Sequence, residues 1–140
     1  MAFLDRKELL KKEMLEVARV DLGKGDFVYV RQMTAFERDR FEQSLRKEVK
    51  DGKGQTNFEL ALENFRAKLA VCTVSDEKGD LVLRPEDYPL LSQSMSAARM
   101  EKIINAAQKL NAITEEDKEV LLKNLEGDQV ANSNSGSVDN

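Results

Sequence analysis

The sequence predicts one α+β domain that is mainly helical, with one or two small antiparallel β-hairpins and a disordered C-terminal tail. Three observations predict this. Six apolar residues recur at helical spacing between Phe58 and Cys72, two β-rich runs flank a glycine-containing tetrad near the start, and the chain from Asp128 is rich in Asn, Ser and Gly. The expected domain spans residues 1–126, and the acidic, polar tail spans 127–140.

The composition fits a soluble globular protein. The 140 residues are 41% apolar and 34% charged, and one cysteine rules out an intrachain disulfide framework. The uncharged runs Leu69–Ser75 and Tyr88–Ala98 are well short of the roughly 20 residues that span a bilayer. No basic patch with interleaved aromatic residues is present. We therefore expect a cytoplasmic protein that binds neither membrane nor nucleic acid.

The central predicted element is a helix that leads directly into a hairpin. Thr56 and Glu59 have the spacing of a capping box, which explains why a helix would begin there. The turn Asp76–Gly79 then separates this helix from a short β-rich run. The apolar stripe of the helix is expected to form the core, and it consists of Phe58, Ala61, Leu62, Phe65, Leu69 and Cys72.

The first thirty residues predict a short helix followed by a hairpin. Asp5 can cap a helix over Arg6–Glu13. The β-rich runs Met14–Leu22 and Phe27–Arg31 are separated by the tetrad Gly23–Asp26. That GKGD tetrad is no phosphate-binding loop, because such a loop needs G-x-x-x-x-G-K-[ST] and leads into a helix rather than a strand.

Two more capping boxes predict where other helices begin. Thr34 with Glu37 starts a helix that runs to about Val49, and Thr114 with Asp117 starts the last helix. The alternating charges outside the apolar stripe of the earlier helix indicate a solvated outer face. In the last helix, acidic residues crowd the positive end of the helix dipole. Its inward-facing residues are expected to be Leu121, Leu122 and Leu125.

Between these helices, Pro85 and Pro89 bracket a short turn or single helical turn. A helix then begins at Ser94 or Ser96 and closes at Asn111. Its apolar stripe comprises Met100, Ile103, Ile104, Ala107 and Leu110.

The chain carries no catalytic signature, and we expect neither an enzyme nor a bound cofactor or metal. It contains no histidine, which removes the commonest general base and metal ligand. Cys72 lies on the apolar stripe and is expected to be a small core residue. The segment Asp76–Asp87 fails as a calcium loop, because Leu81 stands where that loop requires glycine.

The residues that remain as functional candidates belong to the second predicted strand. Val28 and Val30 project from one face of this strand, and the aromatic residues beside them project from the other. An apolar face or strand edge left uncovered would recruit a partner chain. The alternative is that both faces are covered within the domain. The residues predicted to contribute to protein binding are Phe27, Val28, Tyr29, Val30 and Arg31.

Three segments resemble the tail assembly chaperones of long-tailed siphophages and related prophages: VYVRQMTAFERDRFEQSL at 28–45, LAVCTVSDEKGDLVL at 69–83 and AAQKLNAIT at 106–114. The resemblance covers roughly residues 14–126 and consists of a series of elements with a few recurring side chains. Those side chains are Arg31, Thr34, Glu37, Arg38, Asp39, Arg66, Asp76, Gly79, Leu110, Asn111 and Thr114.

The resemblance implies a non-enzymatic protein of the host cytoplasm that is absent from the mature virion. Such chaperones bind the tape measure protein, a long helical chain with apolar stripes, and help to recruit subunits of the major tail tube protein. The resemblance also implies self-association and a longer product made by ribosomal frameshifting. The alternative function is a structural tail component retained in the virion, such as a tail completion protein.

Overall fold

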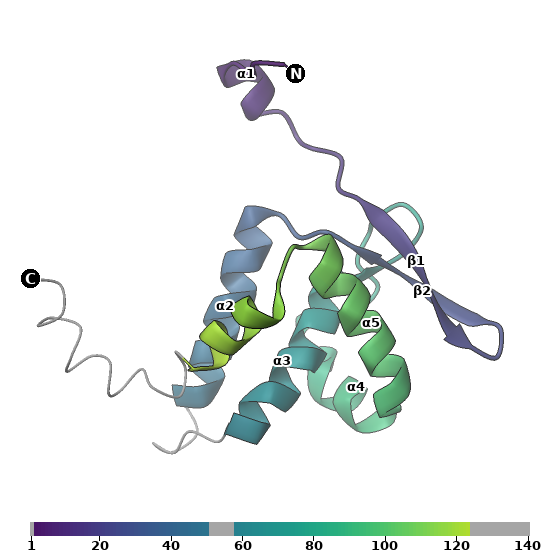
Figure 1. Cartoon of the computed structure of the whole chain (residues 1–140). Helices are drawn as coiled ribbons and strands as arrows, with labels where there is room; N and C mark the ends of the chain where they lie inside the picture. Colours follow the sequence, from purple (N-terminus) through teal and green to yellow (C-terminus); the bar gives the residue numbers. More distant parts are fainter. Residues whose placement is uncertain (1, 51–57, 124–140) are drawn as a thin grey trace, which may run out of the picture.

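The computed structural model describes residues 2–50 and 58–123, and it shows a mainly helical α+β domain with a small antiparallel sheet (Figure 1). The predicted fold class is therefore confirmed. The predicted tail and the Thr56 cap lie outside the described residues.

In chain order the elements are α1 (Arg6–Leu9), β1 (Val17–Gly23), β2 (Asp26–Arg31), α2 (Ala35–Lys50), α3 (Phe58–Thr73), β3 (Val74–Ser75), the 3-10 helix η1 (Pro85–Asp87), α4 (Tyr88–Ser94) and α5 (Ala97–Leu110). Residues 115–123 are also helical.

The three strands follow the order β1-β2-β3, so β2 is central. The predicted hairpin forms, with Val20 opposite Val28, and its turn places Gly23 and Gly25 at positive φ. The second predicted hairpin is reduced to β3 and one bridge between Ser75 and Leu81. Its two-residue strand joins the same sheet by pairing with β2 rather than forming a separate ribbon.

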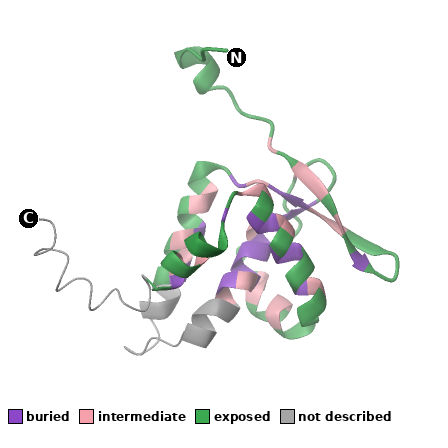
Figure 2. Ribbon diagram, in the orientation of Figure 1, coloured by how far each residue is buried: buried purple, intermediate pink, exposed green. Residues whose placement is uncertain are grey.

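Helices cover one face of this sheet. Helix α5 packs against β1 and β2, and α3 packs against α2, α4 and α5 (Figure 1). The buried residues gather where these elements meet (Figure 2). The largest fully buried side chains are Phe41, Phe65, Leu45, Leu69, Ile103, Ile104, Val30 and Thr73. The inward stripes predicted for the helices are confirmed wherever their side chains are described, except that Cys72, Leu110 and Leu121 are half-buried.

The predicted capping groups make the expected bonds. The Thr34 and Thr114 amides each donate to the carboxylate three residues later, at 2.9 Å and 3.0 Å. At α1, the Glu8 amide donates to Asp5 Oδ1 at 3.0 Å. At α5, the Arg99 amide donates to Ser96 Oγ at 3.3 Å, which selects Ser96 over Ser94. Local hydrogen bonding therefore explains where these helices begin.

Two helices differ from expectation. Helix α1 ends at Leu9 rather than Glu13 and has no buried residue, so no packing extends it. Helix α4 was not predicted: the turn expected near Pro85 is η1, and the chain continues helically to Ser94. Pro89 is tolerated there because it occupies the first turn, where an amide would lack a helical acceptor. None of the helices within the described residues is long and apolar enough to span a membrane.

Candidate protein-binding surfaces

The structure corrects the predicted site on β2. Val30 is fully buried and Arg31 is 7% exposed, while Val28 is half-buried and packs against the core. The two valines are covered because β2 is the central strand and helices pack on the face that carries them. Arg31 projects from the other face and pairs with Glu37 at the start of α2. A partner cannot reach Val30 or Arg31 in the folded domain, so the prediction of an accessible site is wrong for these two residues.

The other face of β2 carries an aromatic pair, the exposed Phe27 and the half-buried Tyr29. Phe27 is 42% exposed, and its ring meets that of Tyr29 edge-to-face at 5.7 Å between centroids. The Arg19 guanidinium on β1 lies 3.9 Å from the Phe27 ring centroid and also pairs with Asp21 at 3.1 Å. Phe27 and Tyr29 are thus the part of the predicted site that remains available, and charged groups border them.

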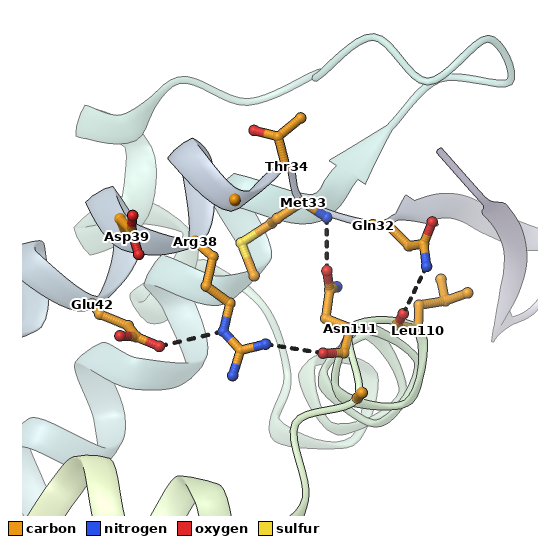
Figure 3. Close-up of a pocket in the computed structure, with 10 residues that line it drawn as sticks. Gln32, Met33, Thr34, Arg38, Asp39, Glu42, Leu110 and Asn111 are labelled. Atoms are coloured by element: carbon orange, nitrogen blue, oxygen red, sulfur yellow. Dashed lines mark hydrogen bonds and ion pairs between the residues drawn. The ribbon is translucent and has the colours of Figure 1, made fainter. Parts of the chain in front are cut away.

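Several of the side chains that carry the family resemblance meet at one junction, where the chain passes from β2 into α2 and from α5 toward the last helix (Figure 3). The Met33 amide donates to Asn111 Oδ1 at 2.7 Å. Arg38 donates to the Asn111 carbonyl at 3.1 Å and to Glu42 at 3.3 Å. Gln32 donates to the Leu110 carbonyl at 3.3 Å. These bonds join two segments that are far apart in sequence.

An ion pair strengthens this junction. Arg31 donates to Glu37 Oε2 at 2.8 Å. Partial burial would raise the pKa of Glu37, but hydrogen bonds from the Thr34 amide and from Arg31 outweigh it and lower that pKa. Glu37 therefore stays ionised at neutral pH and holds both Arg31 and the start of α2.

The junction borders an open polar cavity of about 520 Å³, and several of the groups that line it are already paired with one another. Arg38 is neutralised by Glu42, and the Asn111 side chain is shared among the Met33 amide and the carbonyls of Arg31 and Ala107. Within the described residues, no group of three or more Cys, Asp or Glu side chains could hold a metal ion. We interpret the junction as structural.

An apolar groove of about 560 Å³ lies between α2, the end of α3 and residues 81–88. Phe36 is 68% exposed and Leu81 is 41% exposed, so the groove offers apolar surface directly to solvent. Charged side chains of both signs border it, among them Arg40 and Glu86. The apolar residues that line it are Phe36, Phe41, Val71, Cys72, Leu81, Pro85 and Tyr88.

Cys72 lies in this groove and is half-buried rather than fully enclosed in the core. Burial, with a smaller contribution from the nearby Glu37 carboxylate, raises the pKa of its thiol to about 11. The thiol is therefore protonated at neutral pH and is a poor nucleophile. This agrees with the packing role predicted for Cys72.

Sequence reasoning missed the groove and also a second apolar feature, the N-terminal segment. Residues 2–14 are all exposed, and α1 lies at the end of a segment that leads away from the body (Figures 1 and 2). The one residue whose sequence position indicated the groove was Phe36, because it is apolar but does not belong to the inward-facing stripe of its helix. The large exposed apolar residues of the N-terminal segment are Phe3, Leu4, Leu9, Leu10 and Met14.

Comparison of the chain with protein families, with curated proteins and with solved structures found no match.

Proposed function

We propose that this protein is a tail assembly chaperone of a long-tailed phage or prophage. It binds the tape measure protein in the host cytoplasm, keeps that long chain soluble and helps to recruit tail tube subunits. It acts by protein–protein contact and not by catalysis, and it leaves before the virion is complete.

The apolar groove is the observation that carries this proposal. A long helical client with apolar stripes presents side chains at i, i+3, i+4 and i+7, which is the pattern that a hydrophobic groove accepts. Phe36 and Leu81 are exposed at this groove, whereas a stable monomer buries most of its large apolar side chains. Because basic and acidic groups both border it, the groove suits an amphipathic helix of mixed charge.

Two further observations support a binding role. The absence of histidine from the sequence removes the usual general base, and Cys72 carries a raised pKa that disfavours nucleophilic chemistry. The residues behind the family resemblance, among them Arg31 and Asn111, fix the junction between β2 and α2. Their hydrogen bonds therefore fix the position of the first turn of α2, which contains Phe36.

We expect Phe36→Asp to abolish the protein's ability to keep its tape measure protein soluble while the fold is retained. Phe36 is the second residue of α2, where a carboxylate is favourable for the helix dipole. The matched control is Leu90→Asp, because Leu90 is 70% exposed, lies in the first turn of α4 and does not line the groove. The measurement is the soluble yield and co-purification of the tape measure protein on co-expression.

If the wild-type protein neither raises the soluble yield nor co-purifies with the tape measure protein at low salt, the chaperone proposal fails. If Phe36→Asp and Leu90→Asp behave alike while both remain folded by circular dichroism, the client is bound at another surface. The aromatic pair of Phe27 and Tyr29, of which Phe27 is exposed, would then be the next surface to test.

Mass spectrometry of purified particles separates this function from that of a tail component retained in the virion. We expect the protein to be missing from particles and present in lysates of producing cells. Its stoichiometric presence in particles would favour the structural alternative. The proposal also includes a longer frameshifted product, which requires a slippery run and an overlapping open frame in the gene.

A further inference from the structure

Strand β1 leaves one edge of the sheet open. It is seven residues long, and within the described residues its only strand partner is β2. Its pairing with β2 is irregular between Asp21 and Gly23, so the regular part of this edge is Val17–Asp21. An edge strand carries a row of unpaired amides and carbonyls, which another strand can bind. Gly79 approaches the side chain of Val17 at the start of the strand, but Arg19, Val20 and Asp21 lie further along.

The side chains along this edge are self-complementary about Val20. Arg19 and Asp21 flank it with opposite charges, and Ala18 and Leu22 flank these with apolar side chains. If two copies pair antiparallel about a two-fold axis through Val20, Arg19 of each copy lies opposite Asp21 of the other. Opposite charges directly across an antiparallel pair are stabilising.

Neighbouring registers are disfavoured. In an antiparallel pair, residues directly opposite each other lie on the same face of the sheet. A two-fold axis perpendicular to the sheet therefore has to pass through a residue of each strand and not between two residues. An axis through Arg19 places two arginines opposite each other, and an axis through Asp21 does the same with two aspartates. Like charges in that position are destabilising, so the charges select the register centred on Val20.

The two charged side chains are available for this pairing. The side chain of Arg19 is 57% exposed and that of Asp21 is 78% exposed, and both project from the face opposite the helices. Ala18, Val20 and Leu22 alternate with them along the strand and face the helical layer, where Leu22 is buried. The same axis would therefore place the helices of both copies on one side of a shared sheet and both aromatic pairs on the other.

We propose that two copies of this chain associate through β1 to form one continuous six-stranded antiparallel sheet, with the two-fold axis at Val20. The interface is isologous, because the same strand meets itself. This proposal depends on the sheet edge and the charge pattern, and it holds whether or not the groove binds a tape measure protein.

Charge reversal tests the register. Arg19→Glu and Asp21→Lys each replace two attractive pairs with repulsive ones, so we expect either variant alone to weaken the dimer at least about tenfold. An equimolar mixture of the two variants should dimerise again, because each reversed side chain then meets its opposite on the other chain. Sedimentation velocity of the full chain measures the association.

The mixture also excludes an effect of the Arg19–Asp21 contact within one chain, because that contact stays repulsive in both variants. The control Glu101→Lys changes an exposed residue of α5 and should leave association unchanged. If a single reversal unfolds the chain, the swap of Arg19→Asp with Asp21→Arg restores the internal pair and should dimerise like the wild type.

A wild-type chain that stays monomeric at high concentration overturns the proposal, as do single reversals that leave the dimer intact. A mixture that remains monomeric overturns it as well. If the dimer survives both reversals but dissociates with Phe36→Asp, the copies meet at the groove and not at β1.

Discussion

Replacement of Phe65 by alanine is expected to lower the free energy of unfolding by about 3–5 kcal/mol, a large part of the roughly 5–15 kcal/mol that stabilises a domain. Phe65 is fully buried in α3, and its ring meets that of Phe41 on α2 with 5.5 Å between centroids. Truncation removes this contact and leaves a cavity where the helices meet. Urea denaturation followed by circular dichroism measures the change.

Phe36→Ala is the matched control, because it removes the same side chain from a position that is 68% exposed. Surface changes of this kind alter stability by no more than about 0.5 kcal/mol. Equal destabilisation by the two substitutions would show that α3 is rotated relative to the structure, with Phe65 turned away from the core.

The parts of the fold that could be predicted from the sequence depend on residues close together in the chain. Asp5, Ser96 and the Thr34–Glu37 pair satisfy amides within three residues of themselves. The helical stripes that carry Phe65 and Ile103 are likewise set by a short repeat, and both side chains are buried. Such features require no knowledge of the rest of the fold.

The features that could not be predicted depend on partners distant in sequence. Val74 belongs to the sheet because it meets Val30, more than forty residues earlier. That pairing makes β2 central and buries Val30, so it also decides which part of the predicted site can be reached. Sequence reasoning left open whether both faces of β2 are covered, and the answer differs between them: the valine face is buried and Phe27 is exposed.

The candidate groove was beyond sequence reasoning for the same reason. Its lining residues come from α2, α3 and the segment after β3, and no local pattern unites Phe36 with Leu81 or Tyr88. By contrast, the residues behind the family resemblance were visible in the sequence, but their role was not. The structure shows that Arg31, Thr34 and Asn111 make hydrogen bonds that hold the β2–α2 junction.

Asn111→Ala is expected to lower the free energy of unfolding by about 2–3 kcal/mol, because it leaves the buried Met33 amide without its acceptor. The Met33 amide loses its acceptor at 2.7 Å, and Met33 is buried, so water cannot easily replace that bond. The carbonyl of Ala107 loses the side-chain donor at 2.9 Å but keeps the backbone amide of residue 111 at 3.1 Å. Urea denaturation measures the change in stability, and amide hydrogen exchange at Met33 reports the local effect.

The matched control is Asn105→Ala, which removes the same amide from an exposed position on α5 and should change stability by less than about 0.5 kcal/mol. Exchange at Met33 should accelerate in Asn111→Ala and stay slow in Asn105→Ala. If both variants retain wild-type stability and a protected Met33 amide, Asn111 does not hold this junction. If only Asn111→Ala frees that amide, the Leu-Asn pair that ends α5 fixes the chain just before α2. The position of Phe36 at the groove then depends on a residue that lies far later in the sequence.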